Sequence, residues 1–162
     1  MIASVSDLSE IGIDSSRTQT VGPMRAAYVF ATELSHSGVL EHVARVGVEL
    51  FGSLGLSGHR HGTDKAVLLG LSGEEPERVD PNAAADLVSD VIDGGVLSLL
   101  QLHDLPFEAQ RDVVFHQRQS LPGHTNGMRF RAFNEDGEAV HQRVYYSTGG
   151  GTIVEEAFLQ ES

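Results

Sequence analysis

The spacing of the apolar residues changes along the chain, and this change constrains the fold more than any other feature of the sequence. In the first part, apolar side chains recur at intervals of three and four, which predicts helices. We expect one helix over residues 23–36, a short one that begins after Thr63, and one over residues 81–93. Proline opens the first and third of these segments and glycine follows each of them, as helix boundaries favour.

Elsewhere the residues are β-branched and partly alternating, which is typical of strands. Strands are predicted at residues 43–51, 96–102, 113–115, 128–133 and 139–147, with a short apolar stretch at 152–154. An Asp-Gly turn within residues 134–137 predicts a hairpin. The pattern as a whole predicts an α+β fold in a single domain over residues 1–162, with a mixed sheet and about three helices.

Charge excludes several classes of partner. The chain has 11 Lys and Arg residues against 23 Asp and Glu, a net charge of −12 with neutral histidine. Phosphate backbones and anionic membrane surfaces would be repelled, so we expect neither nucleic acid nor a membrane as partner. The sequence shows neither an apolar run of membrane-spanning length nor a secretory signal, and the expected location is cytoplasmic.

Cysteine is absent from the sequence. The chain therefore cannot build a disulfide, a thiolate nucleophile or a cysteine-ligated iron–sulfur cluster. Any such cluster must be held by another polypeptide segment.

Four segments rich in glycine or hydroxyl residues stand between the predicted elements, at 15–20, 52–63, 123–128 and 147–151. We expect the first two to be loops, the second a flexible one. Free backbone N–H groups in such loops can bind an anion, although glycine in a single loop more often marks a turn. Four such loops in one small domain favour a shared anion-binding site.

Two histidines, His61 and His124, are candidates for proton transfer. His59 and His61 are separated by one residue and would face the same side of an extended strand. No third ligand has a diagnostic spacing, so no metal site is predicted. His61 is the preferred general acid or base, and His124 is the second candidate. The alternative for each is a loop histidine bonded to backbone or water, and the other six are interpreted as surface or structural residues.

Taken together, the loops resemble the N-terminal β domain of the bacterial iron–sulfur L-serine dehydratases. The matching strings run in order from about residue 4 to residue 156, nearly the whole chain. They include Thr20-Val21-Gly22-Pro23-Met24, Phe51-Gly52-Ser53-Leu54, His61-Gly62-Thr63, His124-Thr125-Asn126-Gly127-Met128 and Tyr146-Ser147-Thr148-Gly149-Gly150-Gly151.

The resemblance implies a fold similar to the allosteric substrate-binding domain of some D-3-phosphoglycerate dehydrogenases. It also implies a partner, a helical catalytic domain whose cysteines hold a 4Fe-4S cluster that acts as Lewis acid on the hydroxyl of L-serine. The products would be pyruvate and ammonia. The isolated chain is expected to be inactive, and an exposed docking face is expected to favour a homo-oligomer.

The resemblance further implies which residues form the site. The family's loops that face the catalytic domain correspond here to substrate-binding Ser16, Thr18, Thr20, Thr63, His124 and Asn126, with His61 for acid–base catalysis. The family's hydroxyl loop reads Gly-Pro-Ser-Ser-Ser-His-Thr, and the gap-free match in this chain is Asp14-Ser15-Ser16-Arg17-Thr18-Gln19-Thr20. Gln19 can form hydrogen bonds but cannot exchange a proton near neutral pH, and Arg17 adds a fixed positive charge.

Two further hypotheses belong to other classes of protein. The chain could be a stand-alone regulatory domain that binds a small carboxylate or phosphate. It could also be a diverged copy that associates with a partner but has no dehydratase activity.

Overall fold

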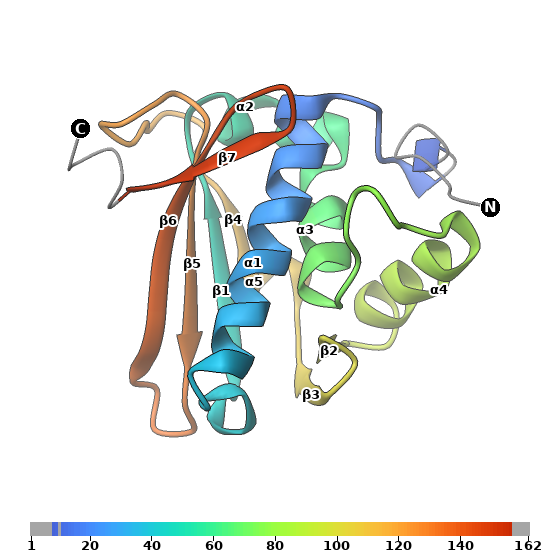
Figure 1. Ribbon diagram of the computed structural model, residues 1–162, viewed down its shortest axis with the longest axis vertical. Helices are drawn as coiled ribbons and strands as arrows, with labels where there is room; N and C mark the ends of the chain where they lie inside the picture. Colours follow the sequence, from blue (N-terminus) through green and yellow to red (C-terminus); the bar gives the residue numbers. More distant parts are fainter. Residues whose placement is uncertain (1–7, 10, 157–162) are drawn as a thin grey trace.

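A mixed five-stranded sheet forms one layer of the fold, and α1 lies across one of its faces (Figure 1). The computed structural model describes residues 8–9 and 11–156. The strands are β1 (Arg45–Leu50), β4 (Val113–Phe115), β5 (Gly127–Phe133), β6 (Ala139–Gly149) and β7 (Thr152–Glu155), in the order β4-β1-β5-β6-β7. β1 and β4 are parallel, whereas the other neighbouring pairs are antiparallel.

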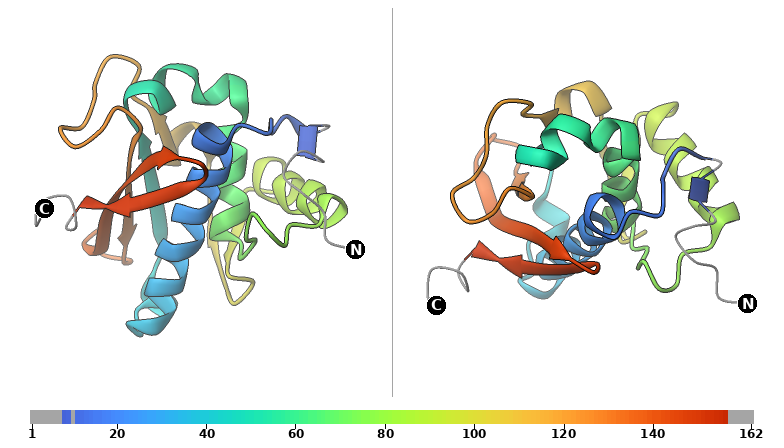
Figure 2. Two further views of the ribbon diagram at one scale, coloured as in Figure 1. Left: turned by 45° about the horizontal axis from the view of Figure 1, so that its top comes forward. Right: turned by 90° about the horizontal axis from the view of Figure 1, so that it is seen from above.

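The helices stack outward from the sheet. They are α1 (Gly22–His36), α2 (Gly52–His61), α3 (Thr63–Leu71), α4 (Pro81–Ile92) and the short α5 (Ala109–Asp112). Seen from above, α1 and α3 lie between the sheet and α4 (Figure 2). A two-stranded sheet, β2 (Val96–Leu99) and β3 (His103–Pro106), lies beside α3 and α4. Among residues 8–9 and 11–156, no helix has the length and apolar character that crossing a membrane requires.

The main core lies between α1 and the sheet. Alternate residues of β1 are fully buried, at Val46, Val48 and Leu50, as expected for a strand with one covered face. Phe30 of α1 packs on Phe130 of β5 with their ring centroids 5.3 Å apart. Both rings are completely buried, so this contact fixes how the helix sits on the sheet.

The opposite face of the sheet carries charged side chains. Glu49 of β1 accepts hydrogen bonds from Arg129 at 2.6 Å and pairs with Arg131 at 3.1 Å and with His116 at 3.0 Å. Burial alone would raise the pKa of Glu49, but the hydrogen bonds from Arg129 and His116 outweigh it and the pKa is lowered. The carboxylate therefore stays ionised within this network.

The predicted α+β class and mixed sheet are confirmed, as are the helices at 23–36, after Thr63 and at 81–93. The prediction of a flexible loop over residues 52–63 is wrong, because residues 52–61 form α2. Gly55 within α2 serves close packing, whereas Gly62, with φ of 85°, turns the chain from α2 into α3. A Cβ on Gly55 would lie 2.2 Å from the carbonyl oxygen of His116 and 2.7 Å from that of Leu50.

Three other predictions also need correction. Residues 17–21 form a wide helical turn, labelled η2, that leads directly into α1, where a loop was expected. The strand predicted over 96–102 ends at Leu99, because Leu100 and Gln101 have positive φ and turn the chain into β3. With α2 and α5 included, the structure has five α-helices in its described part instead of about three. The likeness to the allosteric domain of D-3-phosphoglycerate dehydrogenases stays a prediction.

The packing of α2 predicts a specific effect of adding one methyl group. We expect Gly55→Ala to destabilise the chain by about 1–3 kcal/mol, because the new Cβ would overlap two backbone oxygens. Gly47→Ala is the matched control, since a Cβ there meets its nearest atom at an ordinary 3.6 Å. Thermal unfolding of the two variants measures the difference, and equal melting temperatures would contradict this account of α2.

Candidate functional site

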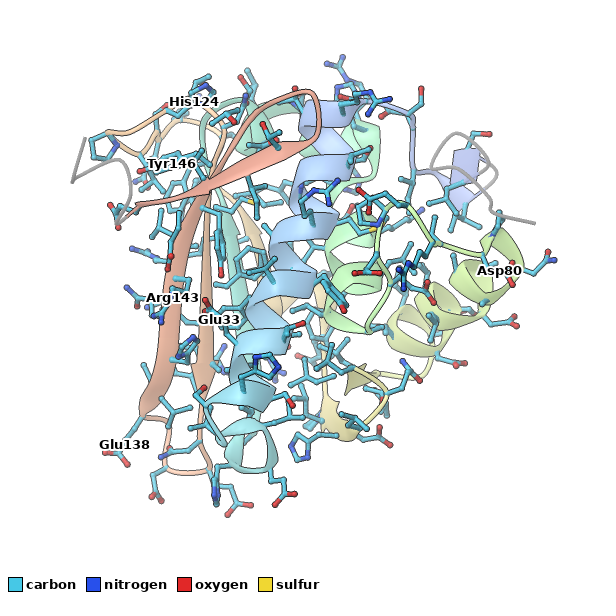
Figure 3. The ribbon with its side chains drawn as sticks, in the orientation of Figure 1. Glu33, Asp80, His124, Glu138, Arg143 and Tyr146 are labelled. Atoms are coloured by element: carbon cyan, nitrogen blue, oxygen red, sulfur yellow. The ribbon has the colours of Figure 1, made fainter. Side chains whose placement is uncertain are left out.

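The segments singled out in the sequence meet at one end of the sheet. η2, α2 and the turn between β6 and β7 lie together at the top of Figure 1. His124 and Tyr146 lie at this end, whereas Glu138 lies at the opposite end, on the β5–β6 hairpin (Figure 3). The four segments at 15–20, 52–63, 123–128 and 147–151 thus lie at one end of the sheet, which we call the loop end.

Ser147 of β6 links three of these segments. Its hydroxyl donates to the carbonyl oxygen of Thr18 at 2.8 Å, and its own carbonyl accepts from the Asn126 amide at 3.3 Å. Its backbone N–H donates to the Asn126 carbonyl at 2.9 Å. The approach to α1 is close, since a Cβ on Gly22 would lie 2.1 Å from the Ser147 hydroxyl oxygen. η2, α1, β6 and the 121–126 segment are therefore joined around one buried serine.

Two of the predicted hydroxyls are used inside the fold. Thr63 donates to the carbonyl of Gln19 at 2.5 Å, and Thr20 lies within hydrogen-bond distance of the carbonyls of Ser16 and Asp14. Both threonines are fully buried. Their side chains therefore hold η2 against α3 and against the preceding segment. Their predicted contact with a substrate stays a prediction.

His61 is the last residue of α2, and its ring meets Asp14. Nδ1 of His61 contacts the Oδ2 atom of Asp14, while the backbone N–H of Asp14 donates to the His61 carbonyl at 3.0 Å. Oδ1 of Asp14 accepts from the backbone N–H of Ser16 at 2.9 Å. The His61 side chain is 30% exposed. Within the described residues no hydrogen bond is made by Nε2, so this nitrogen is available to a ligand.

His124 lies in the loop between β4 and β5, which contacts the start of α2 through the Ser53 N–H and the Thr125 carbonyl, 3.0 Å apart. Its Nδ1 accepts from the backbone N–H of Asn126 at 3.0 Å, and its ring stands edge-on to Tyr146 at 6.5 Å. The Tyr146 hydroxyl accepts from the backbone N–H of Gly123 at 3.3 Å. Burial raises the pKa of Tyr146, so the phenol stays neutral and holds this loop by hydrogen bonding alone.

Two side-chain oxygens at the loop end are buried without a donor. They are Oε1 of Gln19 and Oδ1 of Asn126. Buried acceptors are normally satisfied, and leaving one unpaired costs about 1–3 kcal/mol. Both oxygens could therefore accept a hydrogen bond from a bound molecule.

Hydrogen bonds connect most of the predicted site residues through η2 and Ser147. Direct hydrogen bonds tie η2, which contains Thr18 and Thr20, to the residues at 63 and 147, and His124 shares a loop with Asn126. His59 and His61 are two residues apart on a helix, so they do not share a face as they would in a strand. The His59 side chain is 85% exposed. Asp14 is the residue that sequence reasoning missed.

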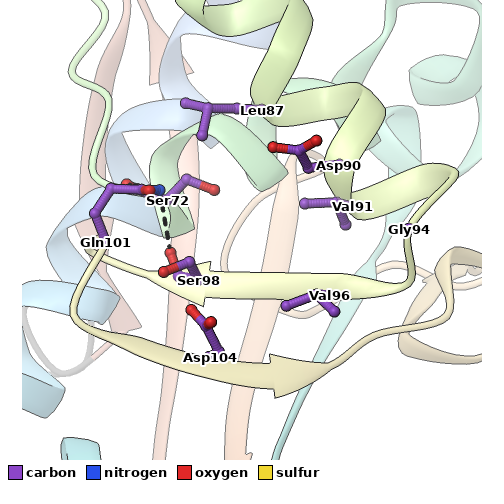
Figure 4. A pocket seen from close by; sticks show the side chains of 9 residues that line it. All are labelled: Ser72, Leu87, Asp90, Val91, Gly94, Val96, Ser98, Gln101 and Asp104. Carbon is purple, nitrogen blue, oxygen red and sulfur yellow. Dashed lines mark hydrogen bonds between the residues drawn. The ribbon is translucent and has the colours of Figure 1, made fainter.

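The described residues offer no metal site, and one of their hollows lies away from the loop end. No group of three or more His, Asp or Glu side chains in this part of the chain could hold a metal ion. A hollow of about 400 Å³ lies between α4 and the β2–β3 hairpin, where Asp90, Asp104 and Gln101 line it (Figure 4). None of the predicted site residues lines this hollow.

The role of Ser147 predicts a local change in dynamics. Ser147→Ala should speed the amide hydrogen exchange of Thr20 and Val21, because the Thr18 carbonyl loses its link to β6. Ser57→Ala is the matched control, since its hydroxyl donates only within α2, to Ser53 at 2.9 Å. Unchanged exchange in Ser147→Ala would show that this serine does not hold η2.

Comparison with known proteins places the whole arrangement in a family. The family described as serine dehydratase beta chain matches residues 4–158. The chain is 49% identical to the L-serine dehydratase of Streptomyces coelicolor over 156 residues and 42% identical to L-serine dehydratase 1 of Escherichia coli over 154 residues. These matches cover 96% and 94% of this chain but 34% of each relative, so the chain spans about a third of their length. The resemblance predicted from the loops is thereby confirmed: the chain belongs to the serine dehydratase beta chain family.

Proposed function

We propose that this chain is the beta chain of an L-serine dehydratase, which converts L-serine to pyruvate and ammonia together with a catalytic domain. One observation carries the proposal. At one end of the fold, Asp14 joins His61 to Ser16 at the start of η2, and Ser147 joins the Thr18 carbonyl of η2 to Asn126. The choice of L-serine as the substrate rests on the names of the relatives, which are L-serine dehydratases.

A partner is needed because this chain does not fit as the holder of an iron–sulfur cluster. Cysteine thiolates are the usual ligands of such clusters, and the sequence contains no cysteine. The described part of the chain also lacks a group of three other ligands. The 4Fe-4S cluster is therefore proposed to be held by the catalytic domain. The two thirds of the relatives that this chain does not match leave room for such a domain.

Within this proposal His61 is the base. Its Nε2 atom accepts the α-proton of L-serine, the Cβ–O bond breaks, and the departing hydroxyl takes up a proton and leaves as water. The enamine that forms tautomerises to an imine, which water hydrolyses to pyruvate and ammonia. Imidazole suits this task because it can take up and release a proton near neutral pH. The partial exposure of the ring, 30%, leaves Nε2 within reach of a substrate at the loop end.

The remaining polar groups divide into two sets. Ser16, Thr18, His124 and Asn126 are proposed to hold the substrate, and the unpaired Oδ1 atom of Asn126 is a suitable acceptor for its ammonium group. Thr20 and Thr63 are proposed to keep η2 in place, since both are fully buried and bonded to backbone.

One observation favours a second candidate, a chain that docks on its partner but does not turn over serine. Gln19 stands where the resemblance places the histidine of the family's hydroxyl loop. Its buried Oε1 atom accepts no hydrogen bond within the described residues. An amide cannot replace a histidine in proton transfer near neutral pH. The same assay of pyruvate formation distinguishes this candidate from the first.

The test is a chimera in which this chain replaces the matching third of the Streptomyces coelicolor relative. We expect the chimera, loaded with its cluster, to form pyruvate from L-serine. His61→Ala should lower the rate by about 100-fold or more, which is typical for the loss of a general base. His59→Ala is the matched control, because this exposed histidine lies on the same helix.

Two results would contradict the proposal. Full turnover in His61→Ala would remove His61 from the reaction. A folded chimera that holds its cluster but forms no pyruvate would favour the diverged chain.

A further inference from the structure

Asp14 connects the start of the η2–α1 helical segment to His61. Its Oδ1 atom accepts the backbone N–H of Ser16, and its Oδ2 atom contacts Nδ1 of His61. A third link runs through the backbone, from the Asp14 N–H to the His61 carbonyl at 3.0 Å. The carboxylate is thus fixed at one oxygen by the backbone and meets the imidazole with the other.

This contact determines which nitrogen of the neutral ring carries the proton. An ionised carboxylate can only accept hydrogen bonds, so Nδ1 of His61 must be the donor. In a neutral imidazole the other nitrogen is then an unprotonated acceptor. Nε2 is therefore left bare, with no hydrogen bond within the described part of the chain.

We propose that Asp14 is a positioning residue that holds His61 as the Nδ1–H tautomer, with Nε2 ready to accept a proton. The effect of Asp14 on turnover rests on the proposed function. The assignment of the His61 tautomer does not depend on that function. Asp14 places its carboxylate beside His61, in the same segment as Gln19.

The tautomer can be read directly by NMR of the chain with ¹⁵N-labelled histidine. Correlations between the ring nitrogens and ring protons, at a pH where the ring is neutral, separate Nδ1–H from Nε2–H. His61→Gln identifies the signals of this residue. We expect Nδ1–H for His61 in the unmodified chain.

Three variants of the carboxylate sharpen the test. Asp14→Asn keeps the shape and can still accept from Ser16, but its NH₂ group would donate to Nδ1 and shift the proton to Nε2. Asp14→Glu keeps a carboxylate and should retain part of the Nδ1–H population. Asp64→Asn is the matched control, since Asp64 lies 4.0 Å from His59 and should leave the His61 signals unchanged.

The chimera then tests the consequence for turnover. Asp14→Asn should lower kcat by about 10-fold or more, because the Nε2–H tautomer cannot accept the proton at Nε2, with a smaller change in KM. Asp14→Glu should restore part of the loss.

The possible failures are distinguishable. Nε2–H in the unmodified chain, or the same tautomer in Asp14→Asn, would overturn the inference. A tautomer change without a larger loss of kcat than in Asp64→Asn would overturn the positioning role. If the unmodified chimera forms no pyruvate, the proposed function fails, and the NMR result still decides the state of His61.

Discussion

At the loop end, neighbouring segments approach one another so closely that glycine is required at several positions, and the packing of the helices on the strands there follows from this approach. At Gly22, Gly52 and Gly62 an added Cβ would lie within about 2 Å of an atom of another segment, at 2.1, 1.8 and 2.1 Å respectively. Ordinary side chains would force these segments apart, and the hydrogen bonds around Ser147 would then be out of reach. The glycines that suggested loops in the sequence are what allow helices and strands to meet.

The loop end combines fully satisfied and unsatisfied polar groups. Thr20, Thr63 and Ser147 are buried and bonded to backbone, which makes the frame rigid. Gln19 and Asn126 each keep a buried oxygen without a donor. Each such oxygen costs about 1–3 kcal/mol, and a bound ligand could recover this free energy.

The sequence predicted those parts of the fold whose signal is local. α1 and α4 show apolar spacing and proline at their start, and β5 and β6 flank an Asp-Gly turn. α2 escaped prediction because glycine, serine and histidine dominate it and its stability comes from packing on other segments. Asp14 escaped for a similar reason, since its partner is 47 residues away and only the folded chain brings them together.

The most direct test of the loop end as a shared, partner-facing site is hydrogen–deuterium exchange of the isolated chain compared with the same residues in the chimera. We predict slower exchange in the chimera over residues 14–22, 52–63, 121–127 and 147–152, and no change in the β5–β6 hairpin around Glu138. Protection confined to that hairpin, with the loop end unchanged, would show that the partner binds elsewhere and would contradict the account.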